Sequence, residues 1–295
     1  TAAEPVVQQS HRSCADRQRH ERDGNAATGK MRKTMIFETH AHYDDEVFNE
    51  DREQLLAGLP EKGIGRVINV GASIETTRTT LALAEAYDYI YAAVGVHPSD
   101  IDGLNEETYS WLKAQTAHPK TVAVGEIGLD YFRKEGNAYK SVQKEWFCRQ
   151  LDLAKEIEKP VIIHSRDAAE DTIQILRDFR KENPQIENPG VIHCYSYSPE
   201  LAKEYVAMGF YIGIGGVVTF KNAKKLVETV AQIPLERILV ETDSPYLCPE
   251  PNRGKRNDSS QIRYVIDRIA DIRGIAPEEV EKQTEMNARK MYRLS

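Results

Sequence analysis

The sequence predicts an α/β protein built as a single (β/α)8 TIM barrel, and two observations carry this prediction. Short apolar runs alternate with longer amphipathic segments from Thr34 almost to the C-terminus, which is typical of parallel strands joined by helices. The apolar runs are nearly uninterrupted Val and Ile, as expected for strands buried on both faces. An open doubly wound sheet is the competing architecture, but no GxGxxG or GxxxxGKS/T phosphate loop follows any of these runs.

The expected elements follow one another in strand and helix order. The strand candidates lie at residues 34–40, 66–71, 90–96, 121–126, 160–164, 190–194, 210–215 and 238–243. Helical patterns lie between and after them, at residues 51–62, 75–87, 105–116, 140–158, 167–182, 198–208, 222–232, 260–272 and 277–292. Because α/β barrels reach about 200 to 250 residues as one domain, one barrel and an N-terminal segment account for the 295 residues.

Residues 1–30 differ from the rest of the chain, because they are polar and show no helical or strand period. We expect a disordered leader or a non-native extension there, and the barrel domain over residues 31–295. This segment lacks the apolar centre of a secretory signal, and no run approaches the roughly 18 apolar residues of a membrane span. Four cysteines without CxxC spacing indicate a reducing compartment. We therefore expect a cytoplasmic protein without a membrane contact.

Composition and charge restrict the classes of function. The chain is 40% hydrophobic and 29% charged, which is ordinary for a globular enzyme with a sizeable core. Its formal net charge is −7, which argues against a protein that holds nucleic acid through a global basic field. Any contact with nucleic-acid phosphates should therefore be local, and we expect no obligate protein partner.

Polar residues that a buried strand should avoid stand at the C-terminal ends of the expected strands, where a barrel carries its active site. They are, in chain order, His40, His42, Glu126, His164, His193 and Asp243. The two histidines of the first strand are at positions i and i+2, so both leave by the same face. Each residue alone could be a cap or a satisfied core side chain. Four imidazoles and two carboxylates at one mouth predict a site for one or two divalent cations.

The residue types leave the identity of the metal open. Zinc and manganese suit His-rich sites, whereas magnesium prefers oxygen ligands, so Mg²⁺, Mn²⁺ and Zn²⁺ all remain candidates. A non-enzymatic alternative is a metal-stabilised binding scaffold. Structural zinc sites are usually closed by four ligands, often cysteine, and six nitrogen and oxygen donors at an open mouth disfavour that alternative.

Four motifs in order carry a family resemblance: Val-Gly-Val-His-Pro (94–98), Gly-Glu-Ile-Gly-Leu-Asp-Tyr (125–131), Ile-His-Ser-Arg-Asp-Ala (163–168) and Glu-Thr-Asp-Ser-Pro-Tyr-Leu (241–247). Together with the His-x-His pair and Arg-Gly-Lys-Arg-Asn (253–257), they resemble the TatD family of metal-dependent deoxyribonucleases, within the amidohydrolase-like superfamily, over residues 34–293. The resemblance implies a DNA-degrading hydrolase of the 3′–5′ exonuclease type that cleaves phosphodiester bonds with a metal-activated water. Its substrate would be DNA, single-stranded or at 3′ ends.

The resemblance also implies roles for the strand-end residues. His40, His42 and Asp243 would bind one metal ion, His164 and His193 the other, and Glu126 would bridge the two. The catalytic residues would be Glu126 and Asp243, with Asp243 the candidate general base that orients or deprotonates the attacking water.

Further residues are candidates for binding the substrate. His97, at the end of the third expected strand, resembles a family position that contacts substrate phosphate. Arg253, Lys255 and Arg256 follow the last strand, and such cations can hold a phosphodiester without demanding a base sequence. A charge cluster on a loop is usually only solvated, but its position after Asp243 favours phosphate binding. Two more candidates are Arg166 and, for stacking or phosphate contact, Tyr131.

Departures from the family pattern concern the substrate more than the metal site. Glu38 stands where Asp is usual, Tyr197 replaces a Gly, and Ser259 stands where Pro often follows the basic loop. Glu38 could reorient the surroundings of the first strand's ligands, and Tyr197 could narrow the mouth. An alternative function that keeps the same metal site is hydrolysis of a carboxylic ester, lactone or amide. The choice between DNA and RNA also stays open.

Overall fold

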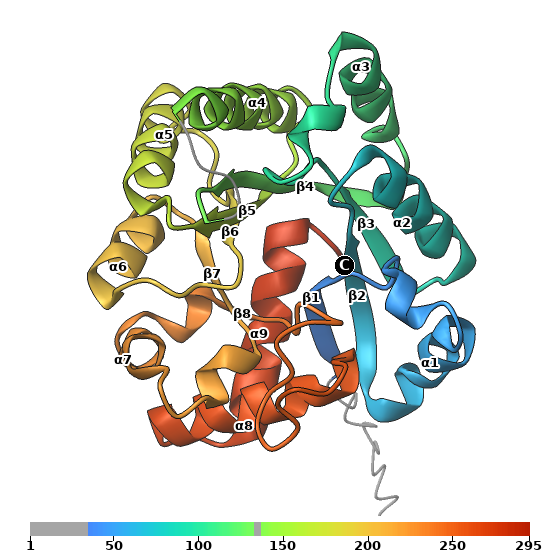
Figure 1. Cartoon of the computed structure of the whole chain (residues 1–295). Helices are drawn as coiled ribbons and strands as arrows, with labels where there is room; N and C mark the ends of the chain where they lie inside the picture. Colours follow the sequence, from blue (N-terminus) through green and yellow to red (C-terminus); the bar gives the residue numbers. More distant parts are fainter. Residues whose placement is uncertain (1–34, 133–136) are drawn as a thin grey trace, which may run out of the picture. The chain divides into compact units, whose positions relative to one another are not determined.

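The computed structural model describes residues 35–132 and 137–295. The leader expected at residues 1–30 lies outside the described residues. Thr34–Ser295 forms one compact unit. Figure 1 shows its strands in the middle of a ring of helices.

Eight strands form one sheet in the order β1 to β8. Their bounds are β1 Ile36–Ala41, β2 Ile64–Val70, β3 Ile90–Val94, β4 Thr121–Asp130, β5 Val161–Arg166, β6 Gly190–Ile192, β7 Tyr211–Ile214 and β8 Ile238–Val240. All seven neighbouring pairs are parallel. The sheet closes where the amide of Asp243 donates to the carbonyl of His40 over 2.9 Å and that of His42 donates to Ser244 over 2.8 Å. The predicted (β/α)8 TIM barrel is therefore confirmed.

The helices of the described residues follow the strands in the expected order. Their bounds are α1 Arg52–Gly58, α2 Ile74–Ala86, α3 Glu106–Gln115, α4 Asn137–Glu156, α5 Ala169–Glu182, α6 Pro199–Ala207, α7 Lys224–Gln232, α8 Ile262–Arg273 and α9 Pro277–Tyr292. The single helix expected over residues 51–62 is divided, because Pro60 lacks the N–H that would continue the hydrogen bonds of α1. A separate 3₁₀ turn, η2 (Pro60–Lys62), follows α1. None of the described helices is both long and apolar enough to cross a membrane.

Strand β4 is longer than the expected 121–126, because its ladder with β5 continues to the pair Asp130 and Arg166. Gly128 allows this close pairing. Its φ of +142° is unfavourable for other residues, and a Cβ there would collide with the carbonyl oxygen of His164. The longer β4 therefore brings both Glu126 and Asp130 beside β5.

The interior of the barrel is apolar at the end where the strands begin. Phe37, Ile68 and Leu239 are buried there in one cluster with Met291 and Tyr292 of α9. The ring of Tyr292 stacks on Phe37 with centroids 5.8 Å apart, and its hydroxyl donates to the carbonyl of Thr39 over 3.2 Å. Helix α9 packs against β1 and β8 and lies in the centre of the ring in Figure 1. It closes the end of the barrel opposite the predicted site.

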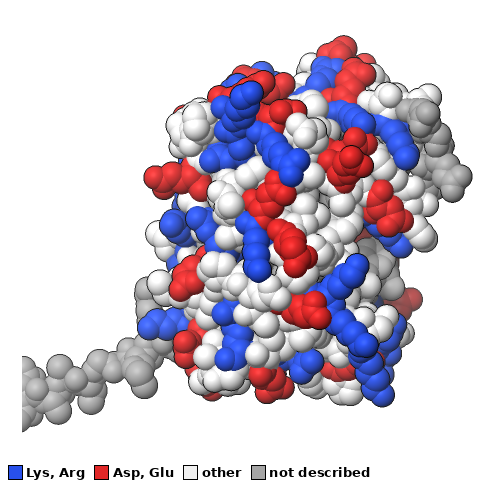
Figure 2. Space-filling model, turned by 90° about the vertical axis from the view of Figure 1, so that its left-hand side faces the viewer, with Lys and Arg blue, Asp and Glu red and all other residues white. Residues whose placement is uncertain are grey.

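The outer surface carries charges of both signs. Figure 2, which shows one side of the molecule, has Lys and Arg side chains interspersed with Asp and Glu. This side therefore offers no continuous basic track, in agreement with the net charge of −7.

Candidate metal centre

The C-terminal ends of the strands surround a cavity of about 850 Å³. Five of the six predicted ligands line it, and the sixth, His40, is fully buried beside them. The six come from five different strands or the short segments that follow them. Groups of their nitrogen and oxygen atoms lie within 4.8 Å of one another: His40, His42 and Glu126; His40, His193 and Asp243; Glu126, His164 and His193. The structure therefore brings together all six side chains that the sequence selects.

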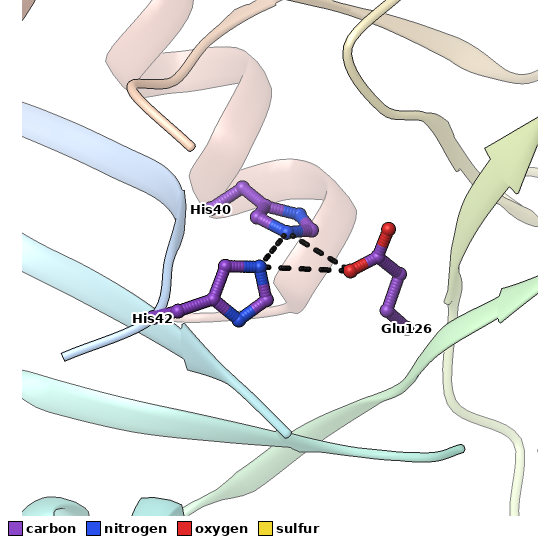
Figure 3. A group of neighbouring side chains, drawn as sticks. All are labelled: His40, His42 and Glu126. Atoms are coloured by element: carbon purple, nitrogen blue, oxygen red, sulfur yellow. Dashed lines mark hydrogen bonds and ion pairs between the residues drawn. The ribbon is translucent and has the colours of Figure 1, made fainter. Parts of the chain in front are cut away.

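Glu126 lies at the centre of this group. Its Oε1 is 2.9 Å from His164 Nδ1 and 3.2 Å from His193 Nε2. Its Oε2 is 3.5 Å from His40 Nε2 and 3.6 Å from His42 Nε2. Figure 3 shows the two imidazoles of the first strand pointing toward this carboxylate. Each oxygen of Glu126 thus faces a different pair of imidazoles, the arrangement needed for a carboxylate shared by two cations.

Asp243 lies beside the two imidazoles of His40 and His42. Its Oδ1 lies 3.5 Å from His42 Nε2 and 3.7 Å from His40 Nε2. The two Nε2 atoms are themselves 3.0 Å apart. Nδ1 of the buried His40 has no hydrogen-bond partner among the described residues, so the polar contacts of this ring are made through Nε2. These donor atoms suit a divalent cation that accepts nitrogen and oxygen ligands.

Backbone and carboxylate neighbours set the orientation of the imidazoles. His42 Nδ1 lies 2.7 Å from the carbonyl oxygen of Val70. A carbonyl only accepts, so Nδ1 carries a proton, and in the neutral ring the lone pair of Nε2 faces the group. His164 Nε2 lies 3.3 Å from Asp130 Oδ2, which suits a ring that donates from Nε2 and turns Nδ1 toward Glu126. Sequence reasoning missed Asp130, because the expected strand ended before it.

Glu241 is a second residue that sequence reasoning missed. It is fully buried directly after β8. Its Oε1 accepts a hydrogen bond from the amide of Cys194 over 2.5 Å and lies 3.3 Å from His193 Nδ1. Gly213 of β7 leaves the space for it, because an added Cβ would stand 2.5 Å from Glu241 Oε2. The available signal was a carboxylate two positions before Asp243, on the same face of an extended chain.

Glu38 lies behind the ligands. Its Oε1 accepts from the amides of His40 and Thr242, and its Oε2 accepts from the Thr242 hydroxyl over 2.7 Å. Burial raises the pKa of Glu38 to about 8. This side chain therefore ties the first strand to the segment that carries Asp243.

The group is strongly coupled electrostatically. Burial alone would lower the pKa of His193, but the carboxylates of Glu126 and Glu241 raise it well above its ordinary value. Burial would also lower the pKa of His42, but hydrogen bonding to Asp243 and the charge of Glu126 raise this pKa to about 9. Despite burial, hydrogen bonding to His42 lowers the pKa of Asp243. Without a cation, His42 and His193 hold protons that a bound cation would replace, whereas burial lowers the pKa of His40.

His97 also faces the cavity, but as a donor. The amide of Ser99 donates to its Nδ1 over 3.1 Å, so the proton of the neutral ring is on Nε2. Burial lowers the pKa of His97 to about 3. Its Nε2 is 3.7 Å from Glu126 Oε1. The ring therefore presents an N–H group to the cavity rather than a lone pair.

The other predicted substrate contacts divide into two groups. Arg166 lines the cavity, and its guanidinium lies 3.9 Å above the ring of Phe132. Four residues are not among the lining side chains: Tyr131, Arg253, Lys255 and Arg256. The hydroxyl of Tyr131 donates to Asp171 over 2.6 Å.

The basic loop residues are engaged outside the cavity. Arg256 makes a two-fold hydrogen-bonded ion pair with Asp51, over 2.8 and 2.6 Å. Arg253 stacks on Phe220 at 4.1 Å, and Lys255 donates to the side chain of Asn252 over 3.1 Å. In the structure these three side chains contact the loop and its neighbours rather than line the cavity, and their role in holding phosphate stays a prediction.

Comparison with known proteins identifies the family. A family model described as TatD related DNase matches residues 37–293. The chain belongs to the TatD-related DNase family. It is 42% identical to the metal-dependent hydrolase YabD of Bacillus subtilis over 261 residues, which cover 88% of this chain and 100% of YabD.

Two further relatives are informative. The 3′-5′ ssDNA/RNA exonuclease TatD of Cronobacter sakazakii is 30% identical, over 87% of this chain and 97% of that protein. The crystal structure of YJJV, a TatD homologue of Escherichia coli, has a TM-score of 0.81 and 31% identity, over 88% of this chain and 98% of the other. The predicted family and the predicted metal-dependent hydrolase acting on ester bonds are thereby confirmed. The His, Glu and Asp groups of this chain fit divalent-metal binding.

Proposed function

We propose that this protein is a 3′–5′ exonuclease that hydrolyses phosphodiester bonds at the ends of single-stranded DNA with two divalent cations. The observation that carries the proposal is the position of Glu126, whose two oxygens face separate imidazole pairs at the base of the cavity. The named activity of the 30% identical exonuclease supports the substrate class.

The residues present fit two cations. His40, His42 and Asp243 would hold one, His164 and His193 the other, and Glu126 both. Nitrogen and oxygen donors suit Zn²⁺ or Mn²⁺ better than Mg²⁺. When bound, the cations would activate water near neutral pH and stabilise charge on the phosphoryl group.

The side chains around this centre position the substrate and move the proton. Asp243 Oδ1 accepts the proton of the attacking water, and its lowered pKa keeps the carboxylate ionised for this role. His97 Nε2–H donates to a non-bridging phosphate oxygen. Arg166, opened toward the cavity and supported by Phe132, holds a phosphate through charge-assisted hydrogen bonds. The leaving group is a 3′ oxygen.

The substitution Asp243→Asn tests the assignment. Loss of a general base lowers a rate by about 10²- to 10⁴-fold, so cleavage of a single-stranded oligonucleotide should fall by at least about 100-fold. Circular dichroism and bound metal are measured in parallel, and Asp271→Asn on the exposed surface of α8 is the matched control. Turnover near that of the unchanged protein with Asp243→Asn would refute the role of Asp243.

The same centre could cleave a carboxylic ester, lactone or amide, and one observation favours this second candidate. Arg166 is the sole Lys or Arg among the described residues that line the cavity, which also suits an uncharged substrate. Purified protein is assayed on single-stranded DNA and RNA and on a panel of esters and lactones. We expect the nucleic acids to be cleaved, and chelation to abolish hydrolysis without a large loss of melting temperature. A cooperative loss of the fold on chelation would instead indicate a metal-stabilised scaffold.

A further inference from the structure

Two large side chains beside the metal centre stay exposed. Tyr246 is 52% and Leu247 40% exposed, and both line the cavity together with Val217. The centroid of the Tyr246 ring is 6.4 Å from that of His42. The cavity thus has an apolar wall next to the ligands, and catalysis as described above does not use it.

The ring of Tyr246 is fixed before any ligand binds. Its hydroxyl donates to Asp45 Oδ2 over 2.6 Å. Its amide donates to the carbonyl of Asp243 over 2.8 Å, and its own carbonyl accepts from the side chain of Asn257 over 2.7 Å. An aromatic side chain held in this way loses little conformational freedom when a flat ligand stacks on it.

The charges of the cavity differ from one side to the other. Arg166 ends β5, which lies across the eight-stranded ring from β1. The Tyr246 side instead carries carboxylates that line the cavity, Asp44, Asp45 and Glu46. Phosphates are attracted to the guanidinium and repelled by the carboxylates. The part of the substrate that binds at Tyr246 should therefore have a flat apolar face. It should carry no phosphate other than the one that is cleaved.

We propose that Tyr246, with Leu247 and Val217, is the stacking platform for the base of the 3′-terminal nucleotide. The proposal rests on the nuclease function and assigns the orientation of the strand: its end lies at Tyr246 and its remaining phosphates lead toward Arg166. Stacking of a base on an aromatic ring does not depend on base identity. A paired base must leave its duplex to reach the ring, so the platform selects unpaired ends.

Steady-state kinetics on two single-stranded oligonucleotides test the platform. One ends in an ordinary nucleotide, and the other ends in a tetrahydrofuran residue that lacks the base. From the cost of removing a stacking ring, we expect the unchanged protein to prefer the first by about 10-fold or more in kcat/KM. Tyr246→Ala should remove this preference, and Tyr246→Phe should keep most of it. Tyr264→Ala, a tyrosine of α8 that is 39% exposed, is the matched control and should retain it fully.

Each other outcome overturns a defined part of the proposal. An unchanged protein that cleaves both strands equally well has no base platform. An equal loss on both strands with Tyr246→Ala, but not with Tyr264→Ala, would give Tyr246 a structural role only. Failure of the unchanged protein to cleave either strand would overturn the nuclease function, and the platform with it.

A 3′-terminal phosphate tests the orientation separately. It would face the carboxylates of Asp44 and Glu46, so kcat/KM should fall by about 10-fold relative to a 3′-hydroxyl end, and the fall should become smaller at high salt. Equal cleavage of both ends would place the strand the other way round.

Discussion

The imidazoles of the metal centre are oriented by groups that do not themselves belong to the six converging ligands. The carbonyl of Val70 faces Nδ1 of His42, Asp130 faces Nε2 of His164, and Glu241 faces Nδ1 of His193. Such partners fix the tautomer and the direction of a ligand. Their loss should therefore weaken metal binding even though the ligands remain.

The substitution Glu241→Gln tests whether such a partner of a ligand imidazole contributes to metal binding. The amide has the size of the carboxylate but no charge to balance His193, so the affinity for Mn²⁺ should fall by about 10- to 100-fold. Calorimetric titration of metal-free protein measures the affinity directly, without an activity assay. Glu61→Gln, an exposed substitution at the far end of the barrel, is the control. Equal affinities for both variants would show that Glu241 does not orient His193.

Glu38 predicts a dependence of stability on pH. Its pKa is raised from 4.5 to about 8 in the folded protein, so the folded state binds this proton more tightly than the unfolded state. The resulting stability is fully present below about pH 4.5 and is lost as pH rises to about 8. One pKa unit corresponds to about 1.36 kcal/mol, which makes the total loss a few kcal/mol.

Glu38→Gln should remove this contribution. Urea unfolding of metal-free protein between about pH 5 and 9 is expected to show a smaller fall in the free energy of unfolding for this variant than for the unchanged protein. Glu61→Gln should reproduce the unchanged slope. Identical slopes for all three proteins would argue that Glu38 is ionised in the fold.

The six ligand candidates could be predicted because each stands where an apolar run ends, and that position can be read from the sequence. The position of Glu241 could not be predicted in the same way. In the sequence, a carboxylate two residues before Asp243 looks the same whether its side chain faces the cavity or hydrogen-bonds to a ligand imidazole. The space that Gly213 leaves beside it exists only when β7 and β8 are paired.

Among the elements, β4 and α9 do most to shape the site. The extension of β4 to Asp130 could not be predicted, because Gly125 and Gly128 interrupt the apolar pattern. The ladder with β5 nevertheless resumes at Ile127, after an irregularity that follows Val124, and pairs Gly128 with His164. Helix α9 was predicted by its period, but its position across the end of the barrel depends on contacts with the first strand, far away in the sequence.

Tyr292→Ala tests the packing of α9. Removal of a large buried aromatic side chain costs about 3 to 5 kcal/mol, and Tyr292 is 3% exposed. Urea unfolding should show a loss of this size, whereas Met286→Ala on the same helix, where the side chain is 52% exposed, should change stability little. A loss below about 1 kcal/mol for Tyr292→Ala would mean that the barrel end does not depend on this contact.

At the scale of the whole molecule, a net charge of −7 and a cavity with one arginine leave few phosphate contacts. The basic loop is expected near phosphate, which stays a prediction, and in the structure Arg256 pairs with Asp51, which follows the neighbouring strand β1. That pairing joins residues 205 positions apart and could not be predicted from local charge.

The salt dependence of cleavage should therefore be shallow. Each phosphate contact on a single strand contributes a slope of about −0.7 in the logarithm of affinity against that of salt concentration. We expect a slope between about −0.7 and −1.5 for kcat/KM, unchanged in Lys255→Ala. A slope near −3, reduced by Lys255→Ala, would show that the basic loop holds the strand.

The seal that α9 forms behind the metal centre has a kinetic consequence. Because Tyr292 and Met291 fill the far end of the barrel, the cavity is a blind pocket. A strand cannot thread through it, and both substrate and product use the same opening. Under the proposed exonuclease function, the mononucleotide product and the shortened strand leave through the same opening, which favours distributive digestion over long processive runs.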